Sequence, residues 1–218
     1  NQTFQSNHTI LYLIIGFFME KVTIPTPCQQ QLNHYCKKWK NDKKLENYRM
    51  QEQSLNKLFH ELLPLNNDIS EILIKSSVLN DFYSTNIFTI YPVAKKIQSL
   101  DIDKYLKEGD ADLVMDIKNV TINGKNKNFY SFATKYYSHH DAMNHPIYDA
   151  YVDKVLRHFR HKDKFYSFKN EDLKDYCQFK LTLIEFQHYY KINCTLKDLD
   201  RYLWLLGKAF FNKYKSIP

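Results

Sequence analysis

A lysine and an aspartate, Lys135 and Asp149, stand fourteen residues apart in the segment 131–149, on either side of an expected short helix and a proline-containing turn. Apolar and aromatic residues flank the lysine, so burial is expected to lower the pKa of its amine and favour the neutral form. A neutral amine can attack C1′ of a nucleoside and form a Schiff base. The pair therefore predicts removal of a base from DNA. The alternative is a surface lysine whose ammonium group reaches water along its aliphatic stem.

Asp149 supplies the second half of that chemistry. It follows Pro146-Ile-Tyr and is expected near the beginning of a helix, where the helix dipole keeps a carboxylate ionised. Cleavage of a glycosidic bond builds positive charge on the sugar, which a fixed carboxylate stabilises. The alternative role is helix capping. Asp141 and Asp153 are reserve candidates, and Asp153 lies one helical turn beyond Asp149.

Three histidines near Asp141 raise the question of a metal site: His139, His140 and His145. Adjacent histidines point in different directions on a helix, and the sequence contains neither HxxxH nor HExxH. We therefore expect no metal and no other cofactor. His139 and His140 are assigned instead to contacts with phosphate or with an extruded base.

The chain is rich in aromatic residues, with 17 Tyr and 15 Phe. Enzymes that flip a base out of the duplex stack it on aromatic faces, although most rings in any protein belong to the core. The tyrosines close in sequence to the Lys135–Asp149 pair are the candidates for base contacts: Tyr136, Tyr148 and Tyr151.

Composition favours one helical domain that binds a polyanion. The 218 residues include 44% hydrophobic residues, enough for a core, and only four Gly, which disfavours Gly-rich phosphate loops. The net charge of +7 favours nucleic acid as a partner. The four cysteines show no CxxC spacing, so a zinc ribbon is not supported. The apolar run 10–19 is about half the ~20 residues of a membrane span, so we expect a core segment and no membrane partner.

Helical periodicity and capping residues predict most of the elements. An amphipathic helix is expected over 45–63, a helix capped by Ser70, another from Pro92 to about Leu100, and a short turn over 101–108. Further helices are expected from Pro146, from about Glu171, and after a capping box that begins at Thr195.

The segment 110–139 reads as helix, turn and helix. Helices over 110–120 and 129–139 flank a turn whose N–H groups, around Asn123, Gly124 and Lys125, are expected to contact phosphate oxygens. This is the outline of a helix-hairpin-helix motif. A β-hairpin with Asn123-Gly124 at its tip is the alternative.

These motifs resemble a known family. Ser-Phe-Ala-Thr-Lys135 followed by Pro-Ile-Tyr-Asp149 is similar to the end of the helix-hairpin-helix motif in oxoguanine DNA glycosylases. The chain resembles more closely a group of small bacterial oxoguanine-glycosylase-like proteins, which also share a late Leu-Trp-x-x-Gly-Lys, here 203–208. The resemblance covers about residues 70–210. It implies an all-α, two-lobed fold over residues 1–218 with no N-terminal β-domain and an active-site cleft between the lobes.

The resemblance also implies roles. Lys135 matches the Schiff-base lysine of the family and Asp149 its catalytic aspartate. Asn80, Tyr83 and Asn86 lie where the family places residues that fill the gap left by the flipped base. We therefore expect a monomeric, cytoplasmic and nucleoid-associated DNA glycosylase that acts on duplex DNA with a modified base. Either Lys135 attacks C1′, with β-elimination as a further step, or Asp149 orients a water.

Three alternatives differ in substrate or class. A bacterial member with divergent reading loops would excise a modified phage base in defence. A DNA-binding module without catalysis would bind with salt sensitivity and leave no abasic product. A helical protein–protein adaptor would not retain DNA even at low salt.

Overall fold

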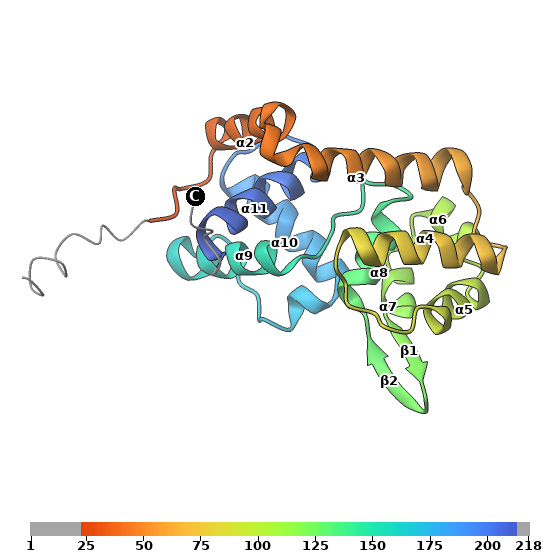
Figure 1. Ribbon diagram of the computed structural model, residues 1–218. Helices are drawn as coiled ribbons and strands as arrows, with labels where there is room; N and C mark the ends of the chain where they lie inside the picture. The colour runs from red at the N-terminus through yellow and green to blue at the C-terminus, as the bar shows by residue number, and fades with distance from the viewer. Residues whose placement is uncertain (1–22, 213–218) are drawn as a thin grey trace, which may run out of the picture.

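The computed structural model describes residues 23–212. They form a predominantly helical protein with one small sheet, and the helices gather in two groups that lie side by side (Figure 1). The expected helical class is confirmed. The elements of the first half are α2 (Gln29–Asn41), η1 (Lys43–Leu45), α3 (Glu46–Lys57), η2 (Leu58–Leu62), α4 (Ile69–Phe82), α5 (Tyr91–Ser99), α6 (Ile102–Glu108) and α7 (Leu113–Ile117). Those of the second half are β1 (Asn119–Ile122), β2 (Lys125–Asn128), α8 (Tyr130–Ser138), α9 (Ala150–Asp163), η3 (Asp172–Lys174), α10 (Tyr176–Tyr189) and α11 (Leu196–Phe211).

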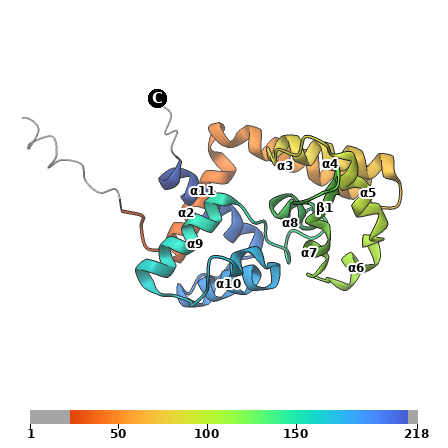
Figure 2. The ribbon, with the colours of Figure 1, turned by 90° about the horizontal axis from the view of Figure 1, so that it is seen from below.

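The first lobe consists of α4 to α8 with the β1–β2 hairpin, residues 69–138. Helix α4 packs against α5 and α8, and α7 packs against α8, so α8 is enclosed by its own lobe on several sides. Eight of the nine residues of α8 (130–138) are buried, and the ninth, Ser131, is half-buried. Viewed from below, α8 lies at the edge of this lobe that faces the other group of helices (Figure 2).

The second lobe consists of α2, α9, α10 and α11, residues 29–41 and 150–211. Helix α11 packs against both α9 and α2. The crossing of α9 and α11 is close because Gly207 has no side chain: a Cβ there would lie 2.6 Å from Cβ of Tyr151 and 2.8 Å from its carbonyl oxygen. The glycine of the Leu-Trp-x-x-Gly-Lys motif therefore lets the first turn of α9 rest directly on α11.

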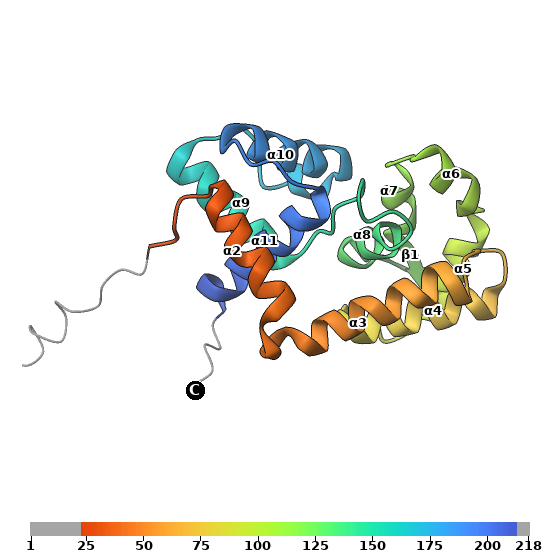
Figure 3. The same ribbon diagram turned by 90° about the horizontal axis from the view of Figure 1, so that it is seen from above.

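Helix α3 joins the lobes. Seen from above, α3 with η2 runs from the second lobe along the first, beside α4 (Figure 3). Among the ion pairs of the described residues, Glu52 of α3 binds Lys197 at 3.3 Å and Arg201 at 2.5 Å, both on or beside α11. These ion pairs join α3 to α11 of the second lobe.

The helix-turn-helix outline over 110–139 is wrong, and the β-hairpin alternative is confirmed. Helix α7 ends at Ile117, and residues 119–122 pair antiparallel with 125–128. Asn123 (φ 49°) and Gly124 (φ 71°) both take positive φ, as a two-residue hairpin turn of type I′ requires. Alternating Val120 and Ile122 suit a strand, and this local preference outweighs the helical pattern.

Three smaller expectations are also corrected. Asp68, not Ser70, caps α4, because its carboxylate accepts hydrogen bonds from the N–H groups at 70 and 71. Pro146 opens no helix: α9 begins at Ala150. Helix α10 begins at Tyr176, after a short 3₁₀ turn over 172–174.

Other boundaries agree with the sequence. The helix over 45–63 is confirmed as α3 with η2, Asp149 lies at the beginning of α9, and Thr195 caps α11 through its hydroxyl oxygen, 3.1 Å from the N–H of Asp198. The core segment expected over 10–19 lies outside the described residues. Over residues 23–212, no helix combines the length and the apolar character needed to cross a bilayer.

Candidate functional site

A cavity of about 350 Å³ lies where the two lobes and α3 meet. That volume is at the lower end of the range of small-molecule sites. The first lobe contributes Phe82, Tyr83, Ser84 and Lys135; α3 contributes Tyr48, Gln51, Glu52 and Leu55; the second lobe and its approach contribute Trp39, Ile147, Asp149, Tyr151, Lys197, Asp200, Arg201, Trp204 and Lys208. Lys135 and Asp149, fourteen residues apart in the chain, therefore face the same space.

Lys135 reaches the cavity from within α8. Its side chain is 2% exposed, and its amine donates to Ser131 Oγ at 2.7 Å, Tyr148 O at 3.0 Å and Ser131 O at 3.3 Å. All three acceptors are neutral. Burial therefore lowers the pKa of Lys135, and the carboxylates of Asp149 and Asp200 oppose this only in part. The expectation of a desolvated lysine is confirmed, and the neutral amine is more accessible here than in water.

The same lysine helps to place Asp149. Residues 146–148 run as an extended segment along α8, where Thr134 Oγ1 accepts from the N–H of Tyr148 at 3.1 Å and Ser131 Oγ donates to the Tyr148 carbonyl at 3.3 Å. The Lys135 amine binds that carbonyl too. Hydrogen bonds from three residues of α8 thus fix the backbone immediately before Asp149, which sets the distance between amine and carboxylate.

Asp149 is the N-cap of α9. One carboxylate oxygen, Oδ1, accepts a hydrogen bond of 2.7 Å from the N–H of Tyr151. An N-cap carboxylate lies at the positive end of the helix dipole. Capping uses one carboxylate oxygen only, so helix capping and a role in the cavity are compatible at this residue.

Asp200, on α11, is a second carboxylate in the cavity that the sequence reasoning missed. Burial raises its pKa to about 7, although Lys197 and Lys135 oppose this and Asp149 reinforces it. Near neutral pH this side chain can therefore hold or release a proton. A signal existed, because Asp200, Trp204 and Lys208 recur at intervals of four and lie along one face of a helix.

The aromatic side chains of Trp39, Tyr48 and Trp204 form one wall of the cavity. The Tyr48 and Trp204 rings lie with centroids 5.0 Å apart, and those of Trp39 and Trp204 are 6.3 Å apart. The Lys208 amine lies 4.2 Å from the Tyr48 centroid and 4.7 Å from that of Trp204, and it donates to the Tyr48 hydroxyl at 2.5 Å. The wall offers π faces with a cation at their edge, a surface on which a flat heterocycle can stack.

Tyr83 closes the cavity beneath the lysine. Its ring centroid is 5.3 Å from the Lys135 amine, and its hydroxyl lies 3.0 Å from Nε2 of His139. Burial lowers the pKa of His139 to about 3, so this imidazole is neutral at physiological pH. The pair of hydrogen-bonded rings holds Tyr83 under the amine without adding charge.

The structure gathers four of the predicted site residues at the cavity: Lys135, Asp149, Tyr83 and Tyr151. Others lie in the core instead. Tyr136 donates its hydroxyl hydrogen to Asn66 at 2.6 Å, His140 faces the same asparagine, and Tyr148 turns its ring away and bonds to Asp153 at 2.9 Å.

The remaining candidates lie on the surface of the first lobe. Asn123, Gly124 and Lys125 are exposed at the hairpin tip, away from the cavity. Asn80 binds the loop that follows α4, and Asn86 in that loop is exposed. Within residues 23–212, no group of three His, Cys, Asp or Glu side chains is placed to hold a metal ion.

Comparison with known proteins adds two similarities. The family model HI_0787_N, described as an N-terminal domain, matches residues 31–145. A Haemophilus influenzae protein described as an uncharacterized protein is 52% identical over 149 residues, which cover 68% of this chain and 72% of the relative. No solved structure matches the chain. The family match spans most of α2, all of the first lobe and Lys135, and ends before Asp149 and α11.

Proposed function

The chain belongs to the HI_0787_N family. From the geometry of its cavity we propose that it is a DNA N-glycosylase that removes a modified base from duplex DNA. The observation that carries the proposal is the cavity in which a buried lysine of lowered pKa and an N-cap aspartate face an aromatic wall. We further propose that the two lobes form a variant of the helix-hairpin-helix glycosylase fold, with a β-hairpin in place of the usual turn and no N-terminal β-domain.

The reaction begins with the flipped nucleotide in the cavity. The neutral Lys135 amine attacks C1′ with its lone pair, and the C1′–N bond breaks with its electron pair going to the leaving base. The base takes up one proton. The sugar ring then opens: the C1′–O4′ bond breaks, one proton passes from the attached nitrogen to O4′, and a protonated Schiff base forms between that nitrogen and C1′. Water hydrolyses this Schiff base to an abasic sugar and the free amine. β-Elimination from the Schiff base nicks the strand as a side branch.

Two carboxylates serve this step differently. Asp149 lies at the positive end of the α9 dipole, and its carboxylate stabilises the positive charge that develops on the sugar as the base departs. Asp200 has a pKa raised to about 7 and is the carboxyl group of the cavity best suited to supply the proton that the leaving base requires.

The aromatic wall suggests how the base is held. A flipped base stacks on π faces such as those of Trp39, Tyr48 and Trp204, and base–aromatic stacking contributes about 1–3 kcal/mol per base. Oxoguanine is the base that the family resemblance implies. A hypermodified phage base is the second candidate, and the same cavity chemistry serves both.

Base release from defined duplexes tests the proposal. Wild-type protein is incubated with oligonucleotide duplexes carrying oxoguanine and, separately, with genomic DNA of phages whose bases are hypermodified, and released bases are quantified. We expect release from one of these substrates and its loss in Lys135→Gln. Lys75→Gln is the matched control, because Lys75 is also buried, with its pKa lowered to about 8, but does not line the cavity.

The outcomes separate the candidate mechanisms and functions. Unchanged release by Lys135→Gln would contradict attack by the lysine and favour a water oriented by Asp149. Salt-sensitive DNA binding without release of any base would indicate a binding module. Absence of DNA retention at low salt would point to a protein–protein adaptor.

A further inference from the structure

Phe88 is the most exposed large hydrophobic side chain among the described residues, at 99%, against 58% for the next, Leu62. An apolar ring left entirely in water forgoes the ~1.5–3 kcal/mol that its burial contributes. A single exposed apolar residue is common and is not by itself evidence of a binding site. The structure of the loop that carries Phe88 gives a reason to expect a function for this ring.

That loop, residues 83–90, is fixed by one side chain. Asn80 Oδ1 accepts from Thr85 Oγ1 at 2.6 Å and from the N–H of Ile87 at 3.0 Å, while its amide nitrogen donates to the Ile87 carbonyl at 3.1 Å. Ile87 is 4% exposed and anchors the loop in the core. Ser84 and Asn86 have positive φ angles, 48° and 59°, which are uncommon for residues other than glycine. The loop therefore presents Phe88 in a set position.

The two chain segments that carry Phe88, α5 and the hairpin hold lysines and no acidic residue, whereas the neighbouring helices α4 and α7 carry Asp81 and Asp116. Residues 82–100 and 117–140 contain no Asp or Glu. The first segment carries Lys95 and Lys96 on α5, and the second carries Lys125 and Lys127 on the hairpin. The two segments meet, because side chains of α5 share a shallow hollow with Val120 and Thr121 of β1.

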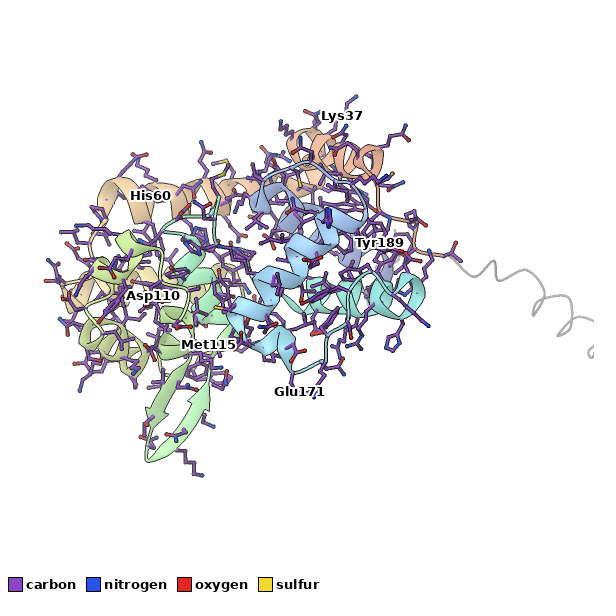
Figure 4. The ribbon with its side chains drawn as sticks, turned by 180° about the vertical axis from the view of Figure 1, so that it is seen from behind. Lys37, His60, Asp110, Met115, Glu171 and Tyr189 are labelled. Atoms are coloured by element: carbon purple, nitrogen blue, oxygen red, sulfur yellow. The ribbon has the colours of Figure 1, made fainter. Side chains whose placement is uncertain are left out.

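The hairpin extends beyond the rest of the lobe. Seen from behind, β1 and β2 project from the body, while the labelled Asp110 and Met115 lie on the lobe above them (Figure 4). All of residues 123–128 are exposed. A projecting ribbon rich in lysine and asparagine, with no acid, is suited to a phosphate backbone.

This surface adjoins the cavity through the same loop. Tyr83 and Ser84 line the cavity, and Phe88 lies four residues beyond Ser84, at most about 14 Å along an extended chain. That reach corresponds to roughly four base steps of ~3.4 Å per strand. A duplex on this surface can thus present one nucleotide to the cavity while Phe88 touches a neighbouring step.

We propose that the surface formed by Phe88, α5 and the β1–β2 hairpin binds duplex DNA, with Lys95, Lys96, Lys125 and Lys127 on phosphates and the Phe88 ring inserted between bases. Apolar side chains that unstack a base step are a known means of bending and opening a duplex. The inference rests on the proposed function, for which it supplies the surface that delivers the nucleotide. It also gives Asn80 a role: Asn80 positions the loop, and Phe88 makes the contact.

Binding to a duplex that contains a tetrahydrofuran abasic site tests the surface, because this site has no glycosidic bond to cleave. Affinity is measured by fluorescence anisotropy at several salt concentrations, and 2-aminopurine beside the site reports unstacking. Wild type is expected to raise the 2-aminopurine signal. Phe88→Ala is expected to lose that rise and bind about tenfold more weakly. Leu62→Ala, at the other prominent exposed apolar residue, is the matched control and is expected to match wild type.

The lysines are tested together. Replacement of Lys95, Lys96, Lys125 and Lys127 by Gln is expected to reduce the slope of log affinity against log salt by about 3–4, roughly 0.9 for each lost phosphate contact. The control replaces four exposed lysines elsewhere and is expected to leave the slope unchanged: Lys57, Lys104, Lys107 and Lys169.

Three results would contradict the proposal that this surface binds DNA. They are an undiminished 2-aminopurine signal in Phe88→Ala, a loss of affinity in the control lysine variant equal to that in the surface lysine variant, and binding of wild type to anionic phosphatidylglycerol vesicles but not to the duplex. Intact binding to the tetrahydrofuran duplex together with no base release from any substrate would contradict the glycosylase proposal and would be consistent with the DNA-binding surface. Base release that is unchanged in all of the surface variants would contradict the DNA-binding surface alone.

Discussion

Asp149 has two duties in the structure, and substitution can separate them. Its Oδ1 atom caps α9 through the N–H of Tyr151, and its carboxylate faces the cavity. Asn caps helices about as well as Asp, so Asp149→Asn keeps the hydrogen bond and loses only the charge at the helix terminus, worth about 0.3–1 kcal/mol. Asp149→Ala removes the cap itself, at about 1 kcal/mol.

These magnitudes give a different pattern in each assay. A loss of 1 kcal/mol lowers Tm by about 2–4 °C in a domain of this size, so we expect that shift for Asp149→Ala and a smaller one for Asp149→Asn. Removal of a group that stabilises transition-state charge costs about 10²–10³ in rate. Both variants are therefore expected to release base at least about a hundredfold more slowly than wild type in single-turnover experiments.

The comparison of the two variants decides between capping and catalysis. If Asp149 acts only as a cap, the rate of base release will follow Tm, and Asp149→Asn will release base almost as fast as wild type. That result would refute the assignment of transition-state stabilisation to Asp149. Equal losses of Tm in both variants would refute the account of the cap.

Three further outcomes follow from the same geometry. Gly207→Ala places a Cβ 2.6 Å from Cβ of Tyr151, so the free energy of unfolding is expected to fall by about 1–2 kcal/mol and base release to slow. Thermal unfolding and a single-turnover assay measure these effects, and an unchanged Tm would contradict the close crossing of α9 and α11. Asp200 binds a proton in the folded state up to about pH 7 and in the unfolded state only up to about pH 3.8, so its contribution to the free energy of unfolding falls as pH rises from about 4 to 7. Urea unfolding of Asp200→Asn should show a smaller fall over this range, and a pH profile identical to that of wild type would contradict the raised pKa of Asp200. Because the Asp200 carboxylate raises the pKa of Lys135, Asp200→Asn should also shift the alkaline rise of borohydride-trapped adduct to lower pH, and a shift to higher pH would oppose the assignment.

The sequence predicted the local features of the site well. Helical periodicity, the Thr195 cap and the position of Asp149 at the start of α9 depend on neighbouring residues, and the structure confirms them. The burial of Lys135 follows from the apolar residues around it in α8. In the segment 119–128 local patterns competed, and the Asn123-Gly124 turn decided in favour of the hairpin.

The composition of the cavity depends on contacts between segments far apart in the chain. Trp39, Tyr48 and Asp200 come from three helices that meet Lys135 only when the lobes close around α3. Periodicity marks each as one face of its own helix and does not say which faces meet. Tyr136 and Tyr148 show the converse: both are near Lys135 in sequence, yet helix and chain direction turn their rings into the core.

The central claim is that the Lys135 amine becomes covalently bound to the DNA sugar, and mapping the trapped adduct tests it most directly. The protein is incubated with its substrate duplex in the presence of borohydride, digested, and the peptide that carries the sugar is identified by mass spectrometry. We expect the adduct on Lys135. An adduct on Lys197 or Lys208, the other lysines of the cavity, or base release without any adduct, would contradict the claim.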